Sequence, residues 1–182
     1  KMAKALGYDY LICLSLETTR NAGDYRELLE SQNEHLLNKE ELLKDTKFPN
    51  IIEFNWISYC IDEKKPEKEP NVYFVKPTDM EQLNSKTIEL TGVTQEDVEQ
   101  AESLESVLTK FNNFVSNTFV LKNKSYCIIT FGHWELAYQL FIETSQKKIN
   151  LAPHFTTFFD ARKEFIKSYP GHRDAINTIE DL

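Results

Sequence analysis

The sequence has no hydrophobic run long enough to cross a bilayer and no signal-peptide pattern in its first residues. We therefore expect no membrane association. Its three cysteines, Cys13, Cys60 and Cys127, lie in apolar runs, and no C-x-x-C or H-x-x-x-H spacing accompanies them. This pattern favours reduced core thiols in the cytoplasm, the nucleus or the mitochondrial matrix over a reactive thiol or a metal site.

Positive charge is also scarce, because 21 lysines and arginines face 29 acidic residues and the net charge is -8. Such a balance opposes nonspecific adhesion to phosphate backbones. The 182 residues are 41% hydrophobic and 12% aromatic, which fits a folded chain with an aromatic-rich core. We expect a single domain over residues 1–182.

Apolar alternation predicts four strands, at Tyr8–Leu16, Ile51–Cys60, Val72–Val75 and Tyr126–Phe131. The charged, proline-bearing stretch 62–70 predicts a hairpin turn. Capping residues and apolar spacing predict helices after Thr94, at Leu104–Val115 after Ser103, at Trp134–Ser145 and at Phe158–Tyr169. Three early strands followed by alternating helices and strands indicate an α/β fold, with helices packed on a mixed sheet.

The segment 21–47 is charged and rich in leucine, which predicts one or two amphipathic helices inserted into the domain. Two interpretations remain, a solvated surface excursion and a docking helix or lid. We expect the segment to lie outside the core and to offer an apolar face to a protein partner. The leucines that would form this docking face are Leu28, Leu29, Leu36, Leu37, Leu42 and Leu43.

The first predicted strand ends in Ser15-Leu16-Glu17. An Asp-x-Glu sequence here would place two carboxylates on one face of the strand tip, because side chains repeat every second residue. Serine brings no negative charge to a divalent cation, so only Glu17 remains from such a pair.

Five segments carry a resemblance to a known family, and they occur in the order YDYLICLSLET, IIEFNWISYCID, VYFVKPT, IELTGVTQEDVEQAESLESVLTKF and YCIITFGHWEL. Together they resemble the DEDD-type (DEDDh) 3′–5′ exonucleases, within the branch of histone-mRNA and RNA-interference exoribonucleases. The resemblance implies an RNase H-like fold, in which helices flank a central mixed sheet.

The resemblance also implies a site, because this family holds two divalent metals, Mg or Mn, with four acidic residues. The first family aspartate falls on Ser15, the glutamate on Glu17, and the third carboxylate on Phe131 or His133. Glu135 is a weaker candidate for a displaced ligand. The last family motif, a histidine followed by an aspartate, is not found, and we expect the chain to stop before it.

These positions predict a catalytically degenerate member of the family, with Ser15, Glu17, Phe131 and His133 as vestigial positions. We expect no catalytic residue and no cofactor, with Glu17 as a metal ligand at most. The expected function is a protein-interaction module in RNA metabolism, with single-stranded RNA as a candidate ligand. The alternatives are an active Mg- or Mn-dependent 3′–5′ exoribonuclease that uses Glu17 and Glu135, and a purely structural subunit docked through segment 21–47.

Overall fold

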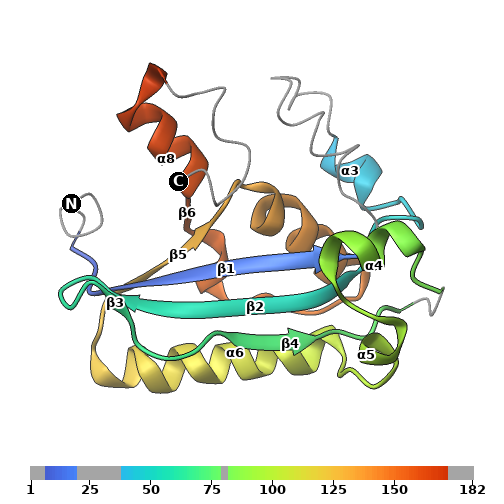
Figure 1. The fold of residues 1–182 in the computed structure, drawn as a ribbon, viewed down its shortest axis with the longest axis horizontal. Coiled ribbons are helices and arrows are strands. Elements are labelled where there is room, and N and C mark those ends of the chain that lie inside the picture. The colour runs from blue at the N-terminus through green and yellow to red at the C-terminus, as the bar shows by residue number, and fades with distance from the viewer. Residues whose placement is uncertain (1–6, 20–37, 79–81, 172–182) are drawn as a thin grey trace.

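The computed structural model describes residues 7–19, 38–78 and 82–171 (Figure 1). Its centre is a six-stranded mixed sheet in the order β3-β2-β1-β5-β6, and β4 also pairs with β2. The strands are β1 (Tyr10–Thr18), β2 (Ile51–Cys60), β3 (Lys65–Pro66), β4 (Asn71–Phe74), β5 (Tyr126–Thr130) and β6 (Phe158–Asp160). No helix within the described ranges has the length and apolar content that a membrane span requires.

β1 is the central strand and pairs on both sides. It runs antiparallel to β2, with Tyr10 opposite Cys60 at one end and Glu17 opposite Glu53 near the other. It runs parallel to β5, and β5 in turn runs parallel to β6. The predicted mixed sheet is therefore confirmed, and β1, β5 and β6 all end at the same edge of the sheet.

The main core lies between the sheet and helix α6 (Leu104–Thr118), which runs alongside β4 in Figure 1. Phe111 of α6 makes ring contacts with Phe54, Trp56 and Phe155, at centroid distances of 5.6, 5.1 and 5.2 Å. The predicted aromatic core is confirmed here, and Trp56 is 2% exposed. Such ring contacts add to the free energy gained by burying apolar area.

The helix starts predicted after Thr94 and Ser103 are confirmed by their capping bonds. The Thr94 side chain accepts a hydrogen bond from the Asp97 backbone N–H, and the Asp97 carboxylate accepts one from the Thr94 backbone N–H. The two bonds form a capping box at α5 (Gln95–Glu99). Ser103 caps α6 in a similar way by accepting from the Ser106 N–H. A helix that the sequence did not predict, α4 (Ser85–Thr91), precedes them and ends at Gly92, whose positive φ of 74° suits glycine.

One prediction of local structure was incomplete and one was wrong. The hairpin turn predicted at 62–70 is present, but β3 also lies within this stretch and pairs with the end of β2. Residues Phe158–Asp160 form strand β6 rather than the start of a helix, and helix α8 (Ala161–Ser168) begins only after Asp160. Pairing with β5 overrides the local helical pattern in β6.

The remaining helical elements are short. They are α3 (Lys39–Leu42), the 3-10 helices η2 (Val120–Lys122) and η4 (Pro153–Thr156), the π-helix η3 (Glu135–Leu140) and helix α7 (Phe141–Gln146). The predicted helix over 134–145 is therefore present, but its first part is π-helical. A buried carboxylate of this element accepts a hydrogen bond from the first residue of β2.

The acceptor in that contact is the carboxylate of Glu143, which is 1% exposed. It accepts from the Ile51 N–H at 2.8 Å, from Gln139 Nε2 at 3.1 Å and from Lys147 Nζ at 2.6 Å. Gln139 also donates to the Pro49 carbonyl at 2.7 Å. Burial raises the pKa of Glu143, and these donors oppose that shift by stabilising the charged form.

The docking face predicted for segment 21–47 needs a correction at Leu42. Its side chain is 7% exposed and packs in a second cluster with Phe48, Trp134, Tyr138 and Ile142. Leu43 is half-buried against the same cluster. Leu42 is therefore part of the domain's packing, because the apolar stripe of α3 turns inward. The other four leucines of the predicted face, Leu28, Leu29, Leu36 and Leu37, lie outside the described residues.

We expect Glu143→Gln to lower the free energy of unfolding by about 1–3 kcal/mol, because an amide cannot accept from all three donors and leaves Lys147 without its ion pair. Urea unfolding measures the change. The matched control is Glu63→Gln, which removes an exposed carboxylate 2.8 Å from Lys65 and should cost less than about 0.5 kcal/mol. Equal effects for the two variants would contradict the structural role of Glu143.

We expect Leu42→Ala to lower the free energy of unfolding by about 2–4 kcal/mol, because it removes a buried side chain and leaves a cavity. Leu43→Ala, at a more exposed neighbouring position, should cost distinctly less. Thermal or urea unfolding distinguishes them. If Leu42→Ala left the stability unchanged, the packing role of Leu42 would be contradicted and its predicted place on the docking face would stand.

Candidate functional site

The candidate site lies at the edge of the sheet where β1, β5 and β6 end. The parallel ladder ends at the pair Cys13 and Ile129, and each strand continues in the same direction beyond it. Ser15 lies two residues further along β1, and Phe131 is the first residue after β5. The structure therefore brings Ser15 and Phe131 to the same end of the sheet.

Glu17 lies at this edge as well, and β2 places a second carboxylate opposite it. The antiparallel register pairs Glu17 with Glu53 and Ser15 with Asn55. Residues directly opposite each other share a face, so these four side chains form one polar row. The Asn55 side-chain amide donates to the Glu53 carboxylate. Sequence reasoning missed Glu53, although the period of two in both strands would have placed it once the register was known.

Asp160 is a second acidic residue that the sequence did not predict. It ends β6 opposite Thr130 and caps α8 by accepting from the Lys163 N–H at 3.0 Å. His133 Nδ1 lies 3.6 Å from Asp160 Oδ2, with 21% and 10% of the two side chains exposed. Burial alone would raise the pKa of Asp160, but the hydrogen bonds from His133 and Lys163 outweigh it. The pKa of Asp160 therefore lies below its ordinary value of 3.8.

His133 thus faces an acidic residue of the neighbouring strand, and its role as a vestigial site residue stays a prediction. Glu135 begins η3 and is 7% exposed. Its Oε2 lies 3.9 Å from the place that a Cβ atom would take at Gly132, whose φ is 111°. Glu135 is therefore packed beneath the turn that follows β5.

The other histidines lie apart from this edge or outside the description. His154 belongs to η4 and makes ring contacts with Phe111 and Phe155, at 5.6 and 4.6 Å. Its imidazole is half-buried beside the core. His35 and His172 lie outside the described residues.

Among the described residues, the side chains at this edge offer few anionic oxygens for divalent cations. Two divalent cations need several anionic oxygens around them, and Ser15 and Phe131 supply none. Within residues 7–19, 38–78 and 82–171, no three His, Cys, Asp or Glu side chains come together in a way that could hold a metal ion. Glu17, Glu53 and Asp160 therefore do not form a three-residue metal cluster in the described structure.

Comparison with known proteins identifies the fold first. The nuclease domain of 3′hExo, a DEDDh family member that was crystallised with rAMP, superposes with a TM-score of 0.72 at 22% identity. That match covers 93% of this chain and 74% of the other. Cell-death related nuclease 4 (CRN-4) gives a TM-score of 0.70 at 16% identity, covering 94% of this chain and 51% of that one. These likenesses show the RNase H-like exonuclease fold that the sequence predicted.

The family follows from the sequence. Residues 40–182 match the family described as Exonuclease, and this chain belongs to that family. The 3′–5′ exoribonuclease 1 of Rattus norvegicus is 25% identical over 162 residues, which are 89% of this chain and 41% of the rat protein. The Homo sapiens protein of the same name is 26% identical over 96 residues, 53% of this chain and 28% of that protein. The chain thus spans less than half the length of these relatives.

The pair formed by His133 and Asp160 gives a prediction for pH dependence. Because the pKa of Asp160 is depressed, its charged form stabilises the fold above pH 3.8, and this contribution is lost as the pH falls through the lower, folded-state value. We expect Asp160→Asn, which keeps the helix cap, to lower the free energy of unfolding at pH 6 by about 1 kcal/mol. The difference from wild type should shrink below pH 3.8.

Denaturant unfolding between pH 2.5 and 7 measures this difference. Asp160→Ala is the control, because it also removes the cap and should cost about 1 kcal/mol more at every pH. A difference between wild type and Asp160→Asn that stays constant with pH would show that the charge of Asp160 contributes nothing.

Proposed function

We propose that this chain is a catalytically inactive exonuclease-like domain that acts as a protein-interaction module in RNA metabolism. The observation that carries the proposal is the pair Ser15 and Phe131 at the carboxyl-terminal ends of β1 and β5. In the resemblance described above, these are positions at which the family has metal-binding carboxylates.

The chemistry of both side chains supports this proposal. The serine hydroxyl is a neutral, weak ligand, whereas Mg and Mn prefer anionic oxygens. Phenylalanine has no ligand atom, and its ring fills space near the sheet edge with apolar volume. Two cations about 3.5–4 Å apart would therefore lack the charge that holds them together.

Charge and surface composition favour a protein over RNA as the principal partner. A net charge of -8 repels phosphates, and Glu17 and Glu53 add two acidic groups at the edge. In the described structure Val120 and Leu121, next to each other after α6, are 54% and 72% exposed. Single-stranded RNA is a weaker, second ligand in this proposal. The three free cysteines support a reducing intracellular compartment.

A second candidate function is an active, Mg- or Mn-dependent 3′–5′ exoribonuclease with a degenerate site. The names of the relatives favour it, since the rat and human proteins are 3′–5′ exoribonucleases. One structure of this fold concerns recognition of the 3′ end of the histone mRNA stem-loop. In this alternative Glu17 and Glu135 would be metal ligands, together with acidic residues outside the described ranges.

We expect the purified protein to leave labelled single-stranded RNA intact in millimolar Mg or Mn, because two carboxylate positions are Ser15 and Phe131. Gel analysis of the RNA over time measures this. Glu17→Gln is the informative control, since it removes the remaining carboxylate of β1. Digestion by wild type that disappears in Glu17→Gln would overturn the proposal in favour of the active enzyme.

A further inference from the structure

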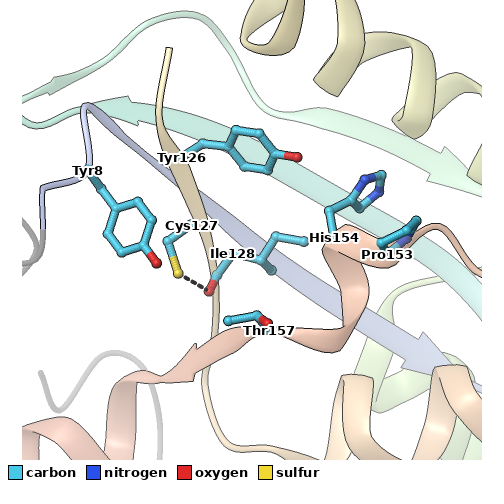
Figure 2. Close-up of a pocket in the computed structure, with 7 residues that line it drawn as sticks. All are labelled: Tyr8, Tyr126, Cys127, Ile128, Pro153, His154 and Thr157. Carbon is cyan, nitrogen blue, oxygen red and sulfur yellow. Dashed lines mark hydrogen bonds between the residues drawn. The ribbon is translucent and has the colours of Figure 1, made fainter. Parts of the chain in front are cut away.

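A cavity of about 440 Å³ lies at the sheet edge opposite the candidate site (Figure 2). It lies where β5 begins, whereas Phe131 follows the end of the same strand. The ladder between β5 and β6 starts only at Ile128. On the side of β5 away from β1, the first residues of β5 therefore have no strand beside them, and this gap is called the notch. The volume is within the range of about 300–1,000 Å³ that is usual for small-molecule sites.

Backbone polar groups of β5 point into this notch. The carbonyl of Ser125 faces β1, because it accepts from the N–H groups of Asp9 and Tyr10 at 3.0 Å. In an extended strand the polar groups of successive residues point to opposite sides. Both the N–H and the C=O of Tyr126 therefore point away from β1, toward the side where β6 has not yet begun. Tyr126 therefore presents one backbone donor and one backbone acceptor on the side of β5 that faces the notch.

The side chains around the notch are uncharged. Tyr8 and Tyr126 supply two aromatic rings and Ile128 an apolar wall, and Thr157 supplies a hydroxyl at the exposed rim (Figure 2). The Cys127 thiol donates to the Ile128 carbonyl at 3.3 Å. Burial raises the pKa of Cys127 to about 11, so this thiol is neutral at physiological pH.

The imidazole of His154, which also lines the notch, is neutral as well. Burial against the core lowers the pKa of its imidazole below 6.5. The lining therefore has no fixed charge that would hold a phosphate or a carboxylate. Aromatic rings, an apolar wall and a paired backbone donor and acceptor suit a flat, neutral molecule.

We propose that this notch is a binding site for a neutral, planar heteroaromatic ring of the nucleobase type, which hydrogen-bonds through one edge to the Tyr126 backbone and packs against the tyrosine rings. The site is separate from the sheet edge that holds Ser15 and Glu17. It therefore does not depend on whether the domain is an active nuclease. Free nucleosides and the bases of an RNA strand share this chemistry.

Four probes test the ligand class, with binding measured by calorimetry or by ligand-observed NMR. Adenosine should bind with a Kd below about 1 mM. Purine riboside, which lacks the exocyclic amino donor, should bind about 3–10-fold more weakly, because one hydrogen bond is lost. AMP and a three-nucleotide oligoadenylate should bind no more tightly than adenosine, since the lining has no cation for their phosphates. Tighter binding of the oligoadenylate would identify an RNA strand as the source of the base.

Three variants locate the binding site. Thr157→Arg places a long side chain at the rim and should weaken adenosine binding at least about 10-fold. Thr109→Arg makes the same change at an exposed position of α6 and should leave the Kd unchanged, as should Ser15→Arg at the other sheet edge. Thermal unfolding checks that Thr157→Arg is folded.

Two results would overturn the proposal. One is the absence of adenosine binding at several millimolar. The other is binding that survives Thr157→Arg but is lost in Ser15→Arg, which would move the ligand to the candidate site. Neither result depends on whether the protein digests RNA. The test of this binding site and the test of the proposed function are therefore independent.

Discussion

In the sheet, β1 pairs in parallel with β5, which pairs in parallel with β6, so the three strands begin at one edge and end at the other. This shared direction separates the molecule into two chemically different ends. At the ends of the strands lie Ser15, Phe131 and Asp160. At their beginnings lie the tyrosines Tyr8 and Tyr126, with uncharged groups around an open notch. Each end gathers residues more than a hundred positions apart, which is why neither is visible as a local motif.

Packing between the sheet and the helices keeps this arrangement in place. Glu143 binds the first N–H of β2 across 92 positions of sequence, and Gln139 binds the Pro49 carbonyl just before it. The segment after β5 is thereby tied to the end of the sheet where the turn carrying Phe131 and His133 lies. A buried carboxylate is costly unless several donors surround it. Here the donors are the Ile51 N–H, Gln139 and Lys147. The position of the candidate site thus depends on a polar contact inside the domain.

The sequence predicted the elements that local patterns specify. Alternation located β2 and β5 well, and side-chain caps at Thr94 and Ser103 located two helix starts, because each signal acts over a few residues. Strand β6 was missed because its identity comes from pairing with β5. The inward face of Leu42 was missed for a similar reason, since its contacts come from the helix after β5.

The candidate site was predictable only in part for the same reason. The resemblance proposed Ser15, Glu17 and Phe131 as site positions, because they lie in recognisable segments. Glu53 and Asp160 become part of the site only through the registers of β1 with β2 and of β5 with β6. A register is set by the whole sheet, and no single segment of the sequence contains it.

The polar row at the candidate site places two carboxylates beside two neutral polar side chains. Glu17 and Glu53 lie directly opposite each other, and like charges in such cross-strand pairs destabilise a sheet. In a two-metal centre the cations neutralise neighbouring carboxylates. Here the Asn55 amide, opposite Ser15, donates to Glu53. Under the proposed inactive role, a neutral donor on β2 complements the neutral serine on β1, so hydrogen bonding at this edge takes over part of the stabilisation that cations would supply.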